Sequence, residues 1–138
     1  MKKILLLTLI ALTSACTSTS DLGAGKTGKS IVVTGKSYDQ VWNASVAAVK
    51  EITGDQSWEV EKNLHISKED KAAGRIEANT GMSLWSWGEV VGVFITPPNN
   101  AAQHKIEVES RAKMKTNVTS NNWEDEVIAN IKKKLNVK

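Results

Sequence analysis

Residues 38–52 and 121–135 repeat apolar side chains at the spacing of a helix. Ser37 and Gln40 have the spacing of a capping box at the start of the first segment. In the second, Asn121 can cap, acidic residues fill the first turn and lysines fill the last. The pattern predicts two amphipathic helices. Their apolar stripes are Val41, Trp42, Ser45, Ala48, Val49 and Ile52, and Trp123, Val127, Ile128, Ile131 and Leu135.

The rest of the pattern indicates strands, because apolar residues alternate with polar ones or form short β-branched runs. The expected strands are residues 31–34, 58–66, 74–80, 88–96 and 104–114, with a polar turn at 68–74. The charges of the last strand, including Glu109 and Arg111, are expected to face solvent, and both histidines, His65 and His104, are also placed on outward positions. The order predicts an α+β domain: an antiparallel sheet of about four to five strands, with an N-proximal helix and a C-terminal helix packed on one face.

Residues 1–15 have the three parts of a secretory signal: Lys2 and Lys3, an apolar run over 4–12, and small residues before Cys16. The apolar run is too short to cross a membrane as a helix. The Leu-Thr-Ser-Ala-Cys sequence at 12–16 resembles the lipobox of bacterial lipoproteins, although Thr13 stands where that family usually has Leu. The resemblance implies cleavage before Cys16 and acylation of Cys16. With Thr17 next in place of Asp, it implies delivery to the outer membrane, with the domain facing the periplasm. The alternative is plain secretory cleavage after Ala15, which leaves a free thiol.

Removal of residues 1–15 changes the apparent charge of the protein. The 138-residue chain has 18 Lys and Arg against 15 Asp and Glu, but without that segment the basic residues number 16 and the net charge is +1. Length, charge and the single cysteine exclude a large multi-domain enzyme, a disulfide-stapled miniprotein and a strongly basic nucleic-acid binder. The division expected is a signal peptide at 1–15, an acylated cysteine with a flexible tether at 16–30, and one domain at 31–138.

The tether contains a match to the phosphate-binding P-loop pattern G-x-x-x-x-G-K-[ST], formed by Gly23, Gly28, Lys29 and Ser30. A P-loop needs a strand before it and a helix after it, so that backbone N–H groups converge on phosphate. Here a β-branched run follows. We interpret the match as coincidence and expect no nucleotide.

The segment from Gly81 to Gly88 contains two of the five tryptophans and is the candidate binding surface. Its candidate residues are Met82, Leu84, Trp85 and Trp87. Exposed tryptophans serve as protein hot spots, membrane-interface anchors or sugar-stacking platforms. The alternative is that these rings cover the sheet edge or the helix–sheet seam. The two histidines lack the spacing of a metal motif and no nucleophile elbow is present, so no catalytic residue, metal or cofactor is expected.

The element order after a lipid-anchored tether resembles the helix-grip domains of small bacterial envelope lipoproteins such as BamC. The resemblance is carried by the Ser-Tyr-Asp-Gln-Val-Trp opening at 37–42, the strand meander and the closing helix, over residues 31–138. BamC carries two such domains, and this chain one. The resemblance implies a non-catalytic scaffold for another envelope component, attached to the membrane by acyl chains and with an envelope protein as partner. The alternative is a periplasmic module that binds glycan or lipid through Trp85 and Trp87.

Overall fold

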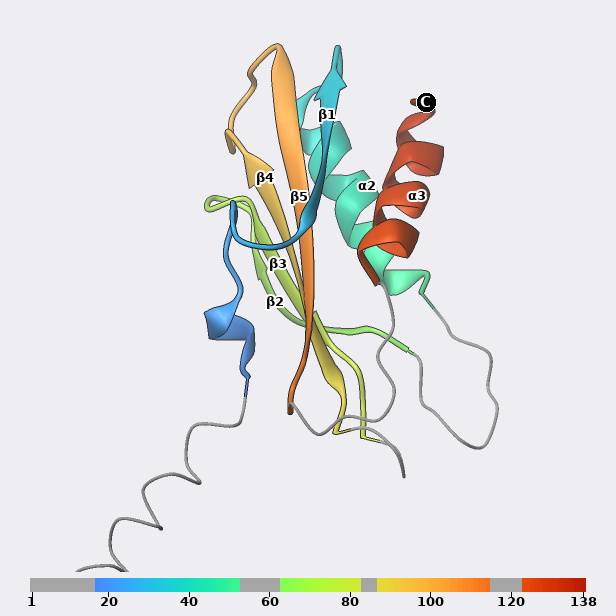
Figure 1. Cartoon of the computed structure of the whole chain (residues 1–138). Coiled ribbons are helices and arrows are strands. Elements are labelled where there is room, and N and C mark those ends of the chain that lie inside the picture. Colours follow the sequence, from blue (N-terminus) through green and yellow to red (C-terminus); the bar gives the residue numbers. More distant parts are fainter. Residues whose placement is uncertain (1–16, 53–62, 83–86, 115–122) are drawn as a thin grey trace, which may run out of the picture.

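The computed structural model describes residues 17–52, 63–82, 87–114 and 123–138. Within them, five antiparallel strands form one sheet with two helices on one face (Figure 1). The elements in chain order are η1 (Thr19–Asp21), β1 (Lys29–Thr34), α2 (Tyr38–Lys50), β2 (His65–Asp70), β3 (Arg75–Asn79), β4 (Glu89–Thr96), β5 (Gln103–Ala112) and α3 (Trp123–Leu135). The predicted α+β class, with both helices on one face, is confirmed.

The strand order is β1-β5-β4-β3-β2, so the chain crosses the whole sheet once. After β1 at one edge, α2 carries the chain to β2 at the other edge. The chain then returns strand by strand to β5, which pairs with β1. This closing pair places α2 and α3 side by side over the same face of the sheet (Figure 1).

The predicted stripe of the first helix is confirmed, since its six residues are all buried. Ser37 and Gln40 form the expected capping box: the Gln40 N–H donates to Ser37 Oγ at 3.2 Å, and the Ser37 N–H donates to Gln40 Oε1 at 2.9 Å. Ser45 is tolerated on the buried face because its hydroxyl donates to the Val41 carbonyl at 2.8 Å. Asn121, the expected cap of the second helix, lies outside the described residues. No helix in the described ranges is long and apolar enough to span a membrane.

The second strand of the sheet ends later in the chain than the alternation of apolar and polar residues predicts. Much of the expected strand 58–66 falls outside the described residues, and β2 continues through residues 68–70, where a turn was expected. β2 is the edge strand of the sheet, and an edge tolerates exposed charged side chains. The reversal is made by residues 71–74 and depends on Gly74, whose φ is 66° and where a Cβ would lie 2.3 Å from the Ile95 carbonyl oxygen.

The central strand β4 is buried on both faces. Val91, Val93 and Ile95 belong to the main core under the helices. On the opposite face Val90 and Phe94 form a second, smaller cluster with Leu22 of the N-terminal segment. A strand covered on both sides reads as a continuous apolar run, as the sequence of β4 does.

Residues 17–28 pack across the sheet face away from the helices, whereas their composition predicts a flexible tether (Figure 1). Leu22 is only 2% exposed and is the one large apolar side chain of this segment. Arg75 donates from Nη2 to the Thr19 carbonyl at 3.0 Å. Gly92 leaves room for the cluster of Leu22 and Phe94: a Cβ there would lie 2.8 Å from Phe94 Cζ and 3.1 Å from Leu22 Cδ1. We call residues 17–28 the strap.

We predict that Leu22→Ala destabilises the domain by about 2–3 kcal/mol, because it leaves a cavity over Val90 and Phe94. Urea unfolding followed by circular dichroism measures the change. Val32→Ala is the control, since Val32 is exposed, and its effect should stay within about 0.5 kcal/mol. Equal effects of the two substitutions would contradict the packing of the strap.

Candidate functional site

One end of the sheet carries an exposed apolar surface. Met82 is 67% exposed and Trp87 is 53% exposed, in the connection between β3 and β4. These are two of the four predicted binding residues; Leu84 and Trp85 lie outside the described residues. For Trp87, exposure favours the contact-surface interpretation over burial at a seam. We call the end of the sheet where these two side chains are exposed, together with the neighbouring Thr17, Thr80, Gly88 and Lys113, the tryptophan end.

The backbone around Trp87 is held by several hydrogen bonds. The Thr80 N–H donates to the Glu89 carbonyl at 3.0 Å, and the Glu89 N–H donates to Thr80 Oγ1 at 2.8 Å. Lys113 donates its backbone N–H to the Gly88 carbonyl at 2.9 Å and its Nζ to the Thr80 carbonyl at 3.0 Å. Trp87 therefore stands next to a fixed frame made by the ends of three strands.

The buried carboxylate of Glu89 ties this frame to α3. It accepts a hydrogen bond from the indole N–H of Trp123, the first residue of that helix. The Ser110 N–H donates to Glu124 Oε1 at 2.9 Å, which fixes the same helix start against β5. The beginning of α3 is thus attached near the tryptophan end, and the helix runs from there toward the opposite end of the sheet (Figure 1).

The strap begins at the tryptophan end as well. The Thr17 N–H donates to the Lys113 carbonyl at 2.7 Å, so the residue that follows Cys16 in the sequence is bound to the end of the sheet. Thr17 and Gly88, the residue after Trp87, therefore both hydrogen-bond to the Lys113 backbone, although they are far apart in the sequence.

Glu109 is the main polar contact between the strap and the sheet. The sequence places it on a solvated strand face, but it is 1% exposed because the strap covers it. Its carboxylate accepts hydrogen bonds from the Gly23 N–H at 2.9 Å, the Thr27 hydroxyl at 2.9 Å and Arg111 Nε at 2.8 Å. Burial by itself would raise the pKa of Glu109, but these donors and the Arg111 charge outweigh it, so the pKa lies below its usual value.

Glu77 and Arg75 form a second ionic contact under the strap. Arg75 Nε donates to Glu77 Oε1 at 2.5 Å, and the guanidinium lies over the Phe94 ring, 5.3 Å from its centroid. Burial acts to raise the pKa of Glu77, yet hydrogen bonds from Thr19 and Arg75 lower it below the usual range. Glu77, Glu89 and Glu109 are thus ionic or hydrogen-bonding supports of the fold.

The residues of the P-loop match adopt a different geometry from a phosphate cradle. Lys29 and Ser30 lie in β1 and pair with Val108 and Glu107, and no helix starts at these residues. Lys29 Nζ is 2.6 Å from Asp125 of α3. The Gly23 N–H binds the Glu109 carboxylate, so this N–H group already holds an anion of the protein itself.

The two histidines lie in different environments and are not neighbours. His65 is exposed on edge strand β2, as expected, but His104 is fully buried, which contradicts its expected outward position. The register shows the reason: His104 has the parity of Ile106 and Val108, which face the core. Its ring lies 5.8 Å from that of Tyr38, and its Nδ1 is 3.1 Å from the Pro97 carbonyl oxygen. β4 and β3 separate the two histidines, and the described residues hold no group of three metal-ligating side chains.

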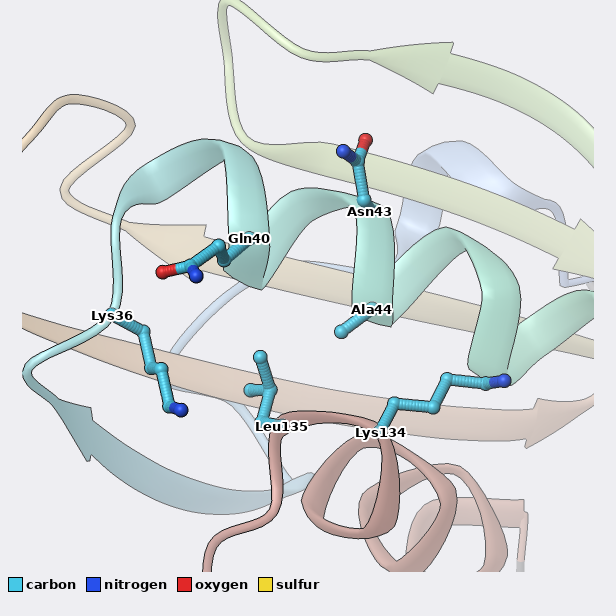
Figure 2. Close-up of a pocket in the computed structure, with 6 residues that line it drawn as sticks. All are labelled: Lys36, Gln40, Asn43, Ala44, Lys134 and Leu135. Atoms are coloured by element: carbon cyan, nitrogen blue, oxygen red, sulfur yellow. The ribbon is translucent and has the colours of Figure 1, made fainter.

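A cavity of about 310 Å³ opens between the helices at the end of the sheet opposite the tryptophan end. Its lining residues are Lys36, Gln40, Asn43, Ala44, Lys134 and Leu135. In Figure 2, Leu135 points toward α2 between Lys36 and Lys134. Lys134 also pairs with Glu51. The cavity therefore combines an apolar floor with a basic and amide rim. Sequence reasoning did not find it, because its residues come from two helices and the turn before α2.

No model of a known protein family matches the chain, and the comparison with curated proteins gives no match. The candidate sites accordingly rest on their geometry alone.

We predict that Glu109→Gln lowers the free energy of unfolding at pH 7 by about 1–3 kcal/mol, because the charge that binds Arg111 is lost inside the strap contact. The pKa of Glu109 is depressed in the folded state, so its contribution is present above the unfolded pKa and is lost as the pH falls through the folded pKa. The variant should therefore show a smaller loss of stability below about pH 5 than the parent protein.

Urea unfolding at a series of pH values measures this difference. Glu126→Gln, at an exposed position of α3, is the matched control and should keep the parent's pH dependence. A parent-like pH profile for Glu109→Gln would show that the carboxylate does not fasten the strap.

Proposed function

We propose that the protein is a lipid-anchored lipoprotein of the bacterial outer membrane whose periplasm-facing domain binds another envelope component without catalysis. The observation that carries the proposal is the hydrogen bond from Thr17 to Lys113. It joins the residue after the lipobox cysteine to one end of a folded domain, so acyl chains on Cys16 would hold that domain in one orientation at the membrane.

The physics of acylation supports stable attachment. Each methylene of an acyl chain contributes roughly 0.8 kcal/mol on entering the bilayer, and two or more chains hold a protein where one does not. In this proposal Cys16 carries a diacylglycerol and an amide-linked chain, as the lipobox resemblance implies.

The environment of the buried carboxylates supports a binding role over a catalytic one. Glu77, Glu89 and Glu109 each accept hydrogen bonds from groups that hold the strap or α3 in place. The hydrogen bonds and charges around these carboxylates stabilise the fold, whereas a general acid or base needs a carboxylate that can reach a substrate.

The cavity between α2 and α3 is the surface on which we place the protein partner. It lies at the end opposite Thr17, so it would face the periplasm when the anchor is in the membrane (Figure 1). Its apolar floor at Leu135 and its polar rim at Lys36 and Asn43 match the composition of a protein contact, with an apolar centre and a wet border.

A second candidate is a glycan- or lipid-binding module that uses the segment of Trp85 and Trp87. The exposure of Trp87 favours it, because an indole ring available to solvent can stack on a sugar or enter a lipid interface.

We predict that Cys16→Ala leaves the protein unacylated and soluble in the periplasm, because no other cysteine can accept the lipid. Metabolic labelling with palmitate and membrane fractionation measure the change. Thr13→Leu is the control: it restores the residue usual in a lipobox and should retain both label and membrane attachment. Unchanged retention of Cys16→Ala in the membrane would overturn the lipoprotein proposal.

We also predict that a photo-crosslinking amino acid at Asn43 captures one stoichiometric envelope protein in living cells, since Asn43 is exposed on the rim of the cavity. The same probe at Lys68, exposed on edge strand β2, is the control and should not capture that protein. Capture of peptidoglycan fragments by a probe at Trp87, with no protein captured at Asn43, would support the second candidate instead.

A further inference from the structure

The chain enters the described fold beside the exposed side chains of the tryptophan end. Lys113 accepts the hydrogen bond of the Thr17 N–H at 2.7 Å and donates its own N–H to Gly88, the residue after Trp87, at 2.9 Å. Because one residue makes both bonds, the Thr17 nitrogen lies within about 10 Å of the Gly88 oxygen. The chain therefore enters the described fold close to the backbone of Gly88, the residue that follows Trp87.

The strap allows little slack between Cys16 and the domain. It is bound through Thr17, again through the buried Leu22, and through the donors Gly23 and Thr27 on Glu109. A flexible linker of the same length would let the domain move tens of ångströms from the membrane. With the strap bound, acyl chains on Cys16 would instead bring the tryptophan end to the bilayer surface.

We propose that the tryptophan end rests on the bilayer that carries the acyl anchor, with Trp87 and Met82 in the interfacial layer. The inference rests on the proposed acylation of Cys16. Tryptophan is favoured at the membrane–water interface because its ring is apolar and its N–H is polar. The thioether of Met82, 67% exposed, gains by entering the same layer. The most exposed apolar side chains near Thr17 are thereby covered.

The distribution of charge indicates that the contact is apolar rather than electrostatic. The first turn of α3, near the tryptophan end, holds Glu124, Asp125 and Glu126, whereas Lys132, Lys133 and Lys134 lie toward the opposite end. An anionic lipid surface would attract the lysine end and repel the acidic turn. The anchor holds the domain against this preference, and because salt screens the repulsion, contact of Trp87 and Met82 should not weaken as the ionic strength rises.

The test uses the full-length protein purified with its acyl chains, after mass spectrometry has established their presence on Cys16. Met82→Cys supplies a labelling site for an environment-sensitive fluorophore, because Cys16 is the sole cysteine of the sequence. The protein is placed in vesicles of phosphatidylethanolamine and phosphatidylglycerol, with and without a spin-labelled quencher lipid. Thr34→Cys, exposed at the other end of the sheet, is the matched control.

We expect the quencher lipid to reduce the Met82→Cys fluorescence several-fold more than that of Thr34→Cys, and no less at high salt than at low salt. Adding Trp87→Glu should reduce the quenching at Met82→Cys, while co-flotation with the vesicles stays unchanged and circular dichroism verifies that the variant is folded. Equal quenching at both positions in the acylated protein would overturn the inference and leave the proposed function standing.

Two other outcomes are equally informative. Absence of the acyl mass on Cys16 would overturn the proposed function, and the inference with it. The third outcome has two parts: the label at Met82→Cys is not quenched in vesicles that hold no other protein, and the same cysteine is protected from thiol reagents in native envelopes. Together they would show that a protein covers the tryptophan end and would overturn the membrane contact.

Discussion

The contact between the strap and the sheet determines much of the rest of this structure. The Glu109 carboxylate gathers a backbone N–H, a hydroxyl and a guanidinium at 2.8–2.9 Å, and the neighbouring Leu22 closes the apolar cluster of Val90 and Phe94. Without the strap, the central strand β4 would expose one apolar face to water, and Glu109 would be an ordinary surface carboxylate. Because hydrogen bonds to a charged acceptor are stronger than neutral ones, a short segment with one large apolar side chain can stay bound.

This contact also gives the molecule two ends with different exposed side chains. The strap carries Thr17 to the end of the sheet where Trp87 and Met82 are exposed, while α2 and α3 form their cavity at the other end. An anchor and a partner surface at opposite ends do not compete for the same space. We infer that the lipid holds the domain with its cavity directed into the periplasm, where a protein of the envelope can reach it.

The sequence predicted part of the candidate site because some signals are local. The glycines around two tryptophans marked the β3–β4 connection, where Trp87 and Met82 are exposed. Glu109 was missed because strand alternation assigns a face but cannot tell whether another segment covers that face. His104 was assigned to the wrong face of its strand, although the sequence contained the correct signal. Two-residue alternation places His104 on the same face as Ile106, which lies in the core. The cavity was missed because its residues meet only when the ends of two helices pack together.

By itself, the sequence determined both helices, the capping box of Ser37 and Gln40, the three central strands β3, β4 and β5, and the α+β class. Periodicity and capping act within a few residues, so they can be read locally. Only the tertiary structure decided that edge strand β2 extends to Asp70, that the strap is bound, and that Thr17 reaches the tryptophan end. Those features depend on contacts such as Gly23 to Glu109, between residues far apart in the chain, and they form only when the sheet brings both partners together.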